Sequence, residues 1–330
     1  MPNYFNGQNS ILAIDNVDGF NEMALKIFQF QFENNTIYKS YVENIGKNPT
    51  AVNTVDDIPF LPISFFKSHR VLSRELPAQK IFSSSGTGNQ GNSKHYVADL
   101  CVYEQGLLKG FQMFYGNIAD YVILALLPSY LERGGSSLVY MADKLIKLSG
   151  KTESGFYLDE YESLNTTLGR LKTEGKKVIL LGVGYALLDM AEKFDVDFQE
   201  LIIMETGGMK GRRREMLKEE LHKVLCDGFG VEKIHSEYGM TELLSQAYSK
   251  GNGIFNCPPW MKIKIRDIND PFAFVDENKS GGINVIDLAN VYSCSFIETQ
   301  DLGKAYADGS FQVLGRFDNS DIRGCNLLIG

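Results

Sequence analysis

Short apolar segments alternate with helix-like segments through the middle of this 330-residue chain. Runs such as 177–183 (KVILLGV) have the length and composition of buried strands rather than of helices. The alternation predicts strands over 121–127, 177–183, 200–205 and 232–236, and helices over 99–114, 134–149, 161–174, 185–194 and 212–227. Such repeats form right-handed crossovers and a parallel sheet that is covered on both faces. The chain is therefore predicted to be an α/β protein with parallel sheets flanked by helices.

The two ends of the chain differ from this middle part. Residues 18–45 predict a helix, with Asp18 as the N-cap and Gly46 just beyond the end. After about residue 250 the helical pattern fades, and short apolar runs with a turn at Asp308-Gly309 predict a smaller β-rich subdomain. We expect one large domain over 1–315, divided into α/β subdomains over about 1–250 and a β-rich subdomain over about 251–315. A hinge and a short C-terminal tail would occupy 316–330.

The composition indicates the cellular compartment and excludes some classes of partner. The formal charge of −8 argues against a nucleic-acid partner and against an acidic membrane surface. Five cysteines without metal-site spacing favour a reducing compartment over a disulfide framework, and they offer no zinc motif. The N-terminus lacks the pattern of a signal peptide, and the longest apolar run is too short to cross a bilayer. We therefore expect a soluble cytoplasmic protein without membrane insertion.

A Ser/Gly-rich segment over 83–94, SSSGTGNQGNSK, has the composition of an anion-binding loop. Small residues let the backbone approach a ligand closely, and main-chain N–H groups and hydroxyls can converge on an anion. Lys94 would add a positive charge. The segment is not the common P-loop, because G-x-x-x-x-G-K-[ST] does not occur. The alternative is a flexible surface turn. Together with 206–209 and 236–242, it is expected at the carboxyl ends of strands, where sheets of this kind bind ligands.

Four segments in a fixed order resemble the motifs of the adenylate-forming superfamily. They are SSSGTGNQGNSK (83–94), ETGGMKG (205–211), SEYGMTE (236–242) and TQDLGKAYADGSFQVLGRFDNSDI (299–322). Within that superfamily the chain most resembles the acyl-protein synthetases of bacterial luciferase operons (the LuxE family), from about Phe60 to the C-terminus. The resemblance implies the large N-terminal domain of these enzymes, which join a carboxylic acid to AMP from ATP.

The resemblance also implies a role for each matched residue. The matched residues are Ser83, Ser84, Ser85, Gly86, Thr87, Gly88 and Lys94 for the β- and γ-phosphates, Gly207, Gly208, Tyr238 and Gly239 for adenine, Thr241 for the α-phosphate, Glu242 for Mg²⁺, and Asp301 and Arg316 for the ribose. One carboxylate combined with phosphate oxygens is a usual Mg²⁺ arrangement. Taken singly, Tyr238 is equally a core residue, Asp301 a turn residue and Glu242 an acid in the first turn of a helix.

The C-terminal part departs from the superfamily pattern. Most members continue into a further domain with a catalytic lysine, and no residue before Gly330 matches it, so the C-terminal domain is expected to be truncated. Lys94 or an arginine is left as the candidate for its role. In the luciferase-operon family an acyl-accepting cysteine lies close to the C-terminus, and Cys325 matches its position. A thiolate attacks mixed anhydrides readily. The alternative is an inert cysteine packed among neighbouring apolar residues.

The resemblance implies a two-step ligase. ATP and Mg²⁺ would convert a carboxylic acid, expected to be a fatty acid, into an acyl-adenylate, and the acyl group would pass to a protein thiol as a thioester. The implied partner is an acyl reductase or an acyl-carrier protein. One alternative is an acyl-CoA or acyl-carrier ligase of the phenylacetate–CoA ligase type. Another is a nucleotide-binding protein without ligase activity, and the sequence does not name the acid.

Overall fold

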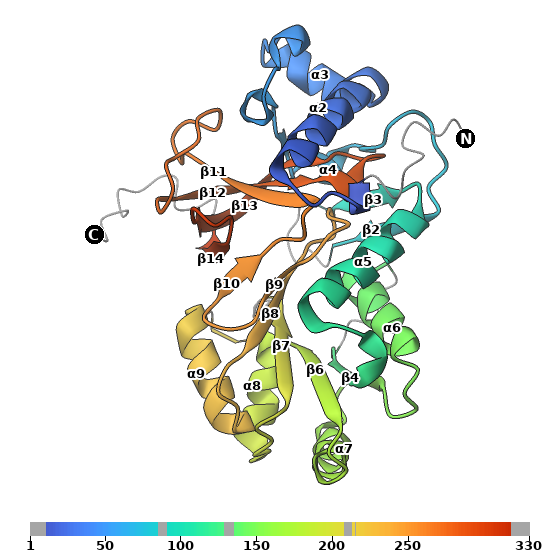
Figure 1. The fold of residues 1–330 in the computed structure, drawn as a ribbon, viewed down its shortest axis with the longest axis vertical. Helices are drawn as coiled ribbons and strands as arrows, with labels where there is room; N and C mark the ends of the chain where they lie inside the picture. Colours follow the sequence, from blue (N-terminus) through green and yellow to red (C-terminus); the bar gives the residue numbers. More distant parts are fainter. Residues whose placement is uncertain (1–10, 85–90, 129–134, 208–212, 215, 318–330) are drawn as a thin grey trace.

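The computed structural model describes residues 11–84, 91–128, 135–207, 213–214 and 216–317 (Figure 1). Its parallel strands are β4 (Tyr121–Leu126), β6 (Lys177–Val183), β7 (Ile202–Thr206) and β8 (His235–Tyr238), with β5 (Gly155–Tyr157) on the outer side of β4. Every residue of β6 after its first is buried, as expected of a strand covered on both faces. The predicted parallel sheet is confirmed, with strand ends within three residues of those predicted.

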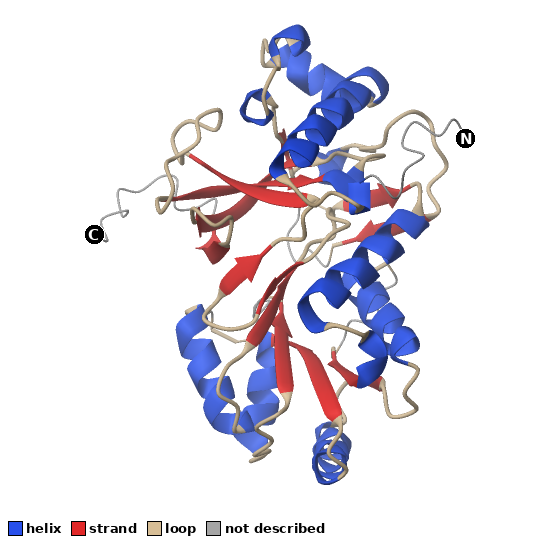
Figure 2. Cartoon of the chain, viewed as in Figure 1, coloured by secondary structure: helices blue, strands red, loops and turns tan. Residues whose placement is uncertain are grey.

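The sheet continues beyond β8 with antiparallel strands. They follow in the order β9 (Ala247–Ser249), β10 (Ile254–Asn256), β14 (Phe311–Arg316), β13 (Phe296–Ala305), β12 (Ser280–Asp287) and β11 (Met261–Arg266), and β1 (Leu61–Pro62) pairs with β13 off this path. Strands β13 and β14 form a hairpin whose turn contains Asp308-Gly309, as predicted. In Figure 2, β6 to β8 run along the long axis of the molecule, whereas β11 to β13 run across it.

Helices cover both halves of the sheet. They are α2 (Val17–Asn34), α3 (Thr36–Asn44), α4 (Phe65–Ser68), α5 (Leu100–Tyr115), α6 (Ser137–Ser149), α7 (Tyr161–Thr173), α8 (Gly184–Lys193) and α9 (Lys218–Phe229). Helices α5 and α6 lie on one side of the parallel strands, and α8 and α9 lie on the other (Figure 1). The mixed α/β class predicted from the sequence is therefore confirmed. The helix predicted over 212–227 begins later than expected, at Lys218.

The helix predicted over 18–45 is divided in two. The N-cap is Asn16 rather than Asp18, and α2 ends at Asn34 because Asn35 has an extended backbone. The side-chain oxygen of Asn35 caps the first turn of α3, and its amide donates to the carbonyl oxygen of Ser293 at 2.9 Å. A contact with a loop far along the chain, between η4 (Leu288–Asn290) and β13, therefore sets the break, which local helical spacing does not reveal.

Two hydrophobic clusters fill the interior. The first joins α2 and α3 to the antiparallel strands, and it includes the fully buried Trp260 and the stacked rings of Tyr38 and Phe296. The second lies between the parallel strands and α5 to α9. The N-terminal helices thus pack against C-terminal strands, so the predicted subdomain limits of about 1–250 and 251–315 do not coincide with the clusters.

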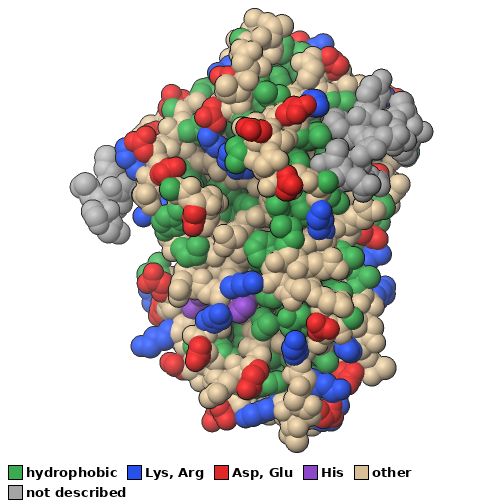
Figure 3. Space-filling model, viewed as in Figure 1, with side chains coloured by type: hydrophobic (Ala, Val, Ile, Leu, Met, Phe, Trp, Pro, Cys, Tyr) green, Lys and Arg blue, Asp and Glu red, His purple; other side chains and the backbone are tan. Residues whose placement is uncertain are grey.

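The surface carries mixed charges. Figure 3 shows acidic and basic side chains interspersed over one face of the molecule, with apolar side chains exposed between them. Because the formal charge is −8, an anionic ligand has to be held by local cations and main-chain N–H groups. Within the described residues, no helix combines the length and the apolar character that crossing a bilayer requires.

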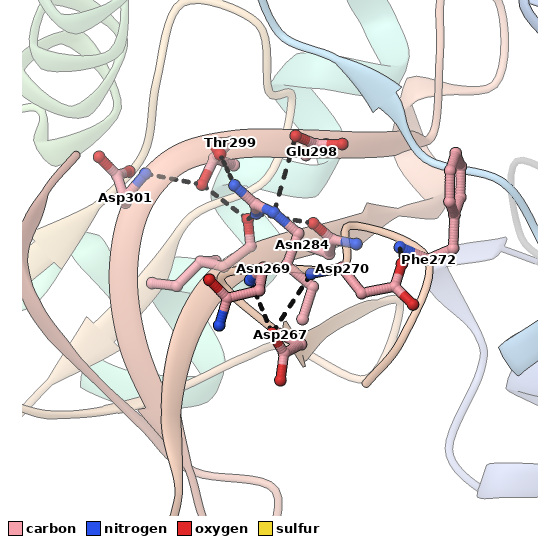
Figure 4. Close-up of polar contacts among 10 residues, drawn as sticks. Asp267, Asn269, Asp270, Phe272, Asn284, Glu298, Thr299 and Asp301 are labelled. Atoms are coloured by element: carbon pink, nitrogen blue, oxygen red, sulfur yellow. Dashed lines mark hydrogen bonds and ion pairs between the residues drawn. The ribbon is translucent and has the colours of Figure 1, made fainter. Parts of the chain in front are cut away.

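A buried arginine on β11 forms hydrogen bonds with β12 and β13 in the antiparallel half of the sheet. Arg266 is 6% exposed and donates to the carbonyl oxygens of Ile283 and Thr299 at 3.0 and 2.7 Å. It also donates to the side-chain oxygen of Asn284 at 2.9 Å. Figure 4 shows Asn284 and Thr299 around this guanidinium, with Asp301 close by on β13. These bonds set the spacing of β11, β12 and β13 next to the site described below.

We predict that Gly281→Ala destabilises the fold by about 2 kcal/mol or more, because a Cβ there would lie 2.2 Å from the carbonyl oxygen of Arg266. Gly169→Ala is the matched control, since a Cβ at this exposed position of α7 meets no atom within 4 Å. The control should stabilise the fold by up to about 1 kcal/mol. Urea unfolding measures both, and equal effects of the two substitutions would contradict the packing described for β12.

Candidate functional site

The base of the Ser/Gly-rich segment is an antiparallel hairpin. Strands β2 (Lys80–Ser83) and β3 (Lys94–Val97) pair as a separate two-stranded sheet. Beyond them, Ser84 N–H donates to the Ser93 carbonyl at 3.1 Å, and Ser93 N–H donates to the Ser84 hydroxyl at 2.9 Å. The expectation that this segment follows a strand of the parallel sheet is therefore wrong. A short connection is enough to join antiparallel strands, whereas parallel strands need a crossover.

Several predicted site residues lie outside the described residues. They are Ser85, Gly86, Thr87, Gly88, Gly208 and Cys325. The structure does describe Lys94, whose side chain is exposed at the start of β3. Successive side chains of a strand point to opposite faces, so Lys94 lies on the face opposite the buried Ser93 and His95.

The carboxyl ends of β7 and β8 lie side by side. These strands are parallel neighbours, which brings Thr206-Gly207 next to Tyr238-Gly239, and both pairs lie at the carboxyl ends of strands, as predicted. The Thr206 hydroxyl donates to the Glu237 carboxylate at 2.5 Å. A Cβ on Gly239 would lie 2.4 Å from the other oxygen of Glu237. Gly239 therefore leaves room for a buried carboxyl group at the end of β8.

Tyr238, Asp301 and Arg316 form one cluster. The Tyr238 hydroxyl donates to Asp301 Oδ2 at 2.9 Å, and Arg316 Nε lies 3.6 Å from Asp301 Oδ1. Asp301 and Arg316 face each other on β13 and β14, and Asp301 N–H donates to the Thr299 hydroxyl at 3.1 Å (Figure 4). Burial raises the pKa of Asp301, and the charge of Arg316 opposes this rise. The Tyr238 ring also meets Phe311 edge to face, so Tyr238 belongs to the core as well as to the cluster.

Glu242 connects this cluster to the hairpin. Its carboxyl group is buried, which raises its pKa, and a hydrogen bond from the Ser93 side chain opposes the rise. Arg316 and Asp301 also lie near enough to shift the pKa of Glu242, in opposite directions. Ser93 is the residue that bonds to Ser84 across the hairpin. Residues from three of the four sequence segments therefore meet at Glu242.

The backbone around Glu242 is held by two buried side chains. His95 Nδ1 lies 2.9 Å from the Thr241 carbonyl oxygen, and His95 Nε2 lies 2.9 Å from the Asn290 side-chain oxygen. The Asn290 amide donates to the Glu242 carbonyl oxygen at 2.7 Å. Asn290 ends the short 3₁₀ helix η4 (Leu288–Asn290). Thr241 is itself half-buried, so its side chain retains access to solvent.

A divalent cation fits this site only with help from a ligand. Among the described residues, no group of three or more His, Cys, Asp or Glu side chains is arranged to hold a metal ion. By itself, Glu242 would offer a cation one carboxylate, and burial makes that carboxylate costly to ionise. A hard cation that also takes phosphate oxygens would compensate that charge, which is how Mg²⁺ is usually held at nucleotide sites.

Sequence reasoning missed a buried acid–base group behind this site. Lys218 lies 2.6 Å from Glu205, the first residue of the segment 205–211, and His222 lies 3.4 Å from the same carboxylate. Burial raises the pKa of Glu205, but Lys218 and His222 outweigh it and bring the pKa down to about 2. Burial raises the pKa of the neighbouring Glu237 to about 7. The place of Glu237 directly before Tyr238, just after the predicted strand 232–236, was the signal available in the sequence.

Solved structures of ligases share this fold. A 2-hydroxyisobutyryl-CoA ligase in an open conformation with 2-HIB-AMP and CoA matches with a TM-score of 0.65 and 12% identity, over 92% of this chain and 70% of the ligase. ATP-bound MatB from Rhodopseudomonas palustris matches with a TM-score of 0.55 and 15% identity, over 72% of this chain and 47% of MatB. The luciferase-like enzyme of the mealworm Zophobas morio matches with a TM-score of 0.52 and 16% identity, over 75% of this chain and 60% of that enzyme.

At these identities the likeness establishes the fold alone: a large mixed sheet flanked by helices, as in these solved structures. No protein-family model matches the chain, and no curated protein matches it in sequence. The site therefore has to be interpreted from its own residues.

We predict that the stability of Glu237→Gln relative to the wild type increases as the pH rises from 4.5 to about 7. Because burial raises the pKa of Glu237 from 4.5 to about 7, the folded chain binds this proton more tightly than the unfolded chain. The contribution of Glu237 to stability is thus full below pH 4.5 and is lost as the pH rises through about 7. The amide does not titrate, so the variant should gain on the order of 2–3 kcal/mol relative to the wild type.

Urea unfolding of both proteins at pH 4.5 and pH 8 measures this difference. Glu232→Gln, at an exposed glutamate in the turn before β8, is the control and should show a constant difference from the wild type. A stability difference between Glu237→Gln and the wild type that is the same at both pH values would contradict the burial argument.

Proposed function

We propose that the chain activates a carboxylic acid with ATP, forming an acyl-adenylate and pyrophosphate. One observation carries the proposal: the cluster of Tyr238, Asp301 and Arg316 lies beside Glu242, and the Glu242 carboxyl group lies close to Ser93 at the base of the Ser/Gly-rich hairpin. A nucleoside triphosphate needs an aromatic and a ribose contact at one end and an anion-binding loop with a cation at the other. The fold is shared with ligases solved with ATP or with an acyl-AMP, which supports the same reaction class.

In this proposal the residues act along the length of the nucleotide. Gly207 leaves the backbone open to the adenine, next to Tyr238, and Asp301 accepts hydrogen bonds from the ribose hydroxyls with Arg316 beside it. The main chain of 83–88 donates to the β- and γ-phosphates, with Ser84 and Ser93 closing the base of the loop. Lys94, exposed on the hairpin, supplies positive charge there.

The reacting centre is assigned to the turn after β8. The Thr241 hydroxyl donates to the α-phosphate and Glu242 holds Mg²⁺ together with phosphate oxygens. Bound Mg²⁺ would neutralise charge as pyrophosphate leaves. The attacking carboxylate binds next to the ends of β7 and β8, where Thr206 and Glu237 lie.

We propose a protein thiol as the acyl acceptor, with Cys325 as the first site and an acyl reductase or acyl-carrier protein downstream. The four cysteines in the described part of the chain are free thiols, which fits a reducing cytoplasm. Burial raises the pKa of Cys257 and of Cys294, which makes their thiolates scarce at neutral pH. The second candidate is transfer to coenzyme A, favoured by the CoA bound in the 2-hydroxyisobutyryl-CoA ligase structure.

We predict ATP–pyrophosphate exchange with one class in a panel of carboxylic acids that ranges from short hydroxy acids to long fatty acids. Glu242→Gln and Asp301→Asn should each lower the exchange rate by about tenfold or more, because each removes a charged contact to the nucleotide or its cation. The control Glu232→Gln should exchange at the wild-type rate.

The absence of exchange with every acid, combined with ATP binding in equilibrium dialysis, would instead indicate a nucleotide-binding protein without ligase activity. Exchange followed by consumption of free CoA would identify the CoA ligase alternative.

We predict that intact-mass analysis after incubation with ATP, Mg²⁺ and the accepted acid shows one acyl adduct on the chain. The adduct should be absent from Cys325→Ser and present in the control Cys101→Ser, whose thiol is exposed on α5. A thioester is cleaved by hydroxylamine at neutral pH, so the adduct should disappear after that treatment. An adduct that persists in Cys325→Ser would exclude this cysteine as the acceptor.

A further inference from the structure

The inner face of β3 is built to hold the turn at Thr241-Glu242. Side chains alternate where this strand begins: Ser93, directly before it, and His95 are 3% and 0% exposed, whereas Lys94 between them is exposed. Two successive inward positions therefore carry polar side chains where a strand normally buries apolar ones. Both make their contacts with residues 241 and 242, which lie 146 or more positions further along the chain.

The contacts of His95 are directional. The Thr241 carbonyl can only accept a hydrogen bond, so the 2.9 Å contact is made by a ring that carries a proton on Nδ1. The Asn290 side-chain oxygen at Nε2 is an acceptor too, because the Asn290 amide donates to Glu242, so a ring protonated on both nitrogens makes both contacts. Phe66 packs edge to face against the ring at 5.8 Å between centroids, and Asn290 lies at the other ring nitrogen. The ring thus has one orientation, and with full burial it cannot touch a ligand.

The same turn is held from a second side. Asn290 donates to the Glu242 carbonyl at 2.7 Å, while the Ser93 side chain lies close enough to the Glu242 carboxyl group to lower its pKa. The main chain of Thr241, the main chain of Glu242 and the carboxyl group of Glu242 thus each have a separate partner. One of the three partners, His95, lies on β3, and Ser93 directly precedes this strand, where the Ser/Gly-rich segment ends.

We propose that His95 is a positioning residue for the Glu242 carboxylate, acting through its hydrogen bond to the Thr241 carbonyl. This rests on the proposed function, in which Glu242 holds the cation and the hairpin binds the phosphates. His95 connects Glu242 to the hairpin, so a shift of β3 moves the cation ligand together with the phosphate-binding loop. Partners that orient a metal ligand typically contribute 10- to 100-fold to metal affinity.

Two substitutions of His95 separate the hydrogen bond from the rest of the ring. The amide nitrogen of asparagine takes the position of Nδ1, so His95→Asn keeps a donor to the Thr241 carbonyl. The amide of glutamine reaches the position of Nε2, so His95→Gln loses that donor and keeps the contact with Asn290. Val178→Ala, in β6 of the other hydrophobic cluster, serves as a control for general destabilisation.

Hydrogen–deuterium exchange of the ligand-free chain tests the inference without any activity. Leu243 N–H donates to the Met240 carbonyl, and the N–H groups of Leu244 and Ser245 donate to Asp287, so this turn has protected amides. We expect these amides to exchange about tenfold faster in His95→Gln than in wild type, and at near wild-type rates in His95→Asn and Val178→Ala. Unchanged exchange in His95→Gln would overturn the inference.

The Mg²⁺ dependence of ATP–pyrophosphate exchange gives the second measurement. The Mg²⁺ concentration for half-maximal rate should rise about tenfold or more in His95→Gln, with the KM for the acid unchanged, and should stay near wild type in His95→Asn. An equal rise in Val178→Ala, or none in His95→Gln, would overturn the positioning role. A wild-type chain that exchanges with no acid would overturn the proposed function instead, and the deuterium measurement would still decide whether His95 holds the turn.

Discussion

The hydrogen bond between Tyr238 and Asp301 is the contact on which the arrangement of the site depends. Tyr238 ends the last parallel strand and Asp301 lies on β13, in the antiparallel half of the sheet. Both groups are largely buried, and an unpaired hydroxyl or carboxylate at that depth costs several times what an exposed hydrogen bond contributes. The two halves of the sheet are therefore held in a single relative position at the site. Thr299 and Arg266 extend this bonding into the neighbouring strands.

The site is made of strand ends whose polar groups are hydrogen-bonded by buried side chains on the side away from solvent. Asp287 shows the pattern: its carboxylate accepts from the N–H groups of Leu244 and Ser245 and from the Ser245 hydroxyl, at 2.6 to 2.9 Å. The turn that carries Glu242 thus has a rigid support on the side away from solvent. A ligand that arrives at such a turn meets groups that are already oriented, so little ordering is needed on binding.

Local patterns predicted β4, β6, β7 and β8, because burial on both faces leaves a continuous apolar run in the sequence, as in β6. They also placed Thr206 and Tyr238 at the carboxyl ends of strands, but not at the ends of neighbouring ones, and they missed the short β5. They did not reveal the β2–β3 hairpin, the helix break at Asn35 or the role of His95. Each of these depends on a partner far along the chain, such as Ser293 for Asn35 and Thr241 for His95. The sequence around a single polar residue does not indicate which distant residue it contacts.

The packing of the N-terminal helices against the last strands has a consequence for how the chain is made. Gln31 on α2 bonds to the main chain of Val291 and exchanges hydrogen bonds with Ser295, 264 residues away. The cluster around α2 and α3 therefore cannot close until the chain has been synthesised past Phe311, whereas the cluster between α5 and α9 has all its partners earlier. Until then the apolar faces of α2 and α3 stay uncovered, and exposed apolar surface of this kind favours aggregation during synthesis.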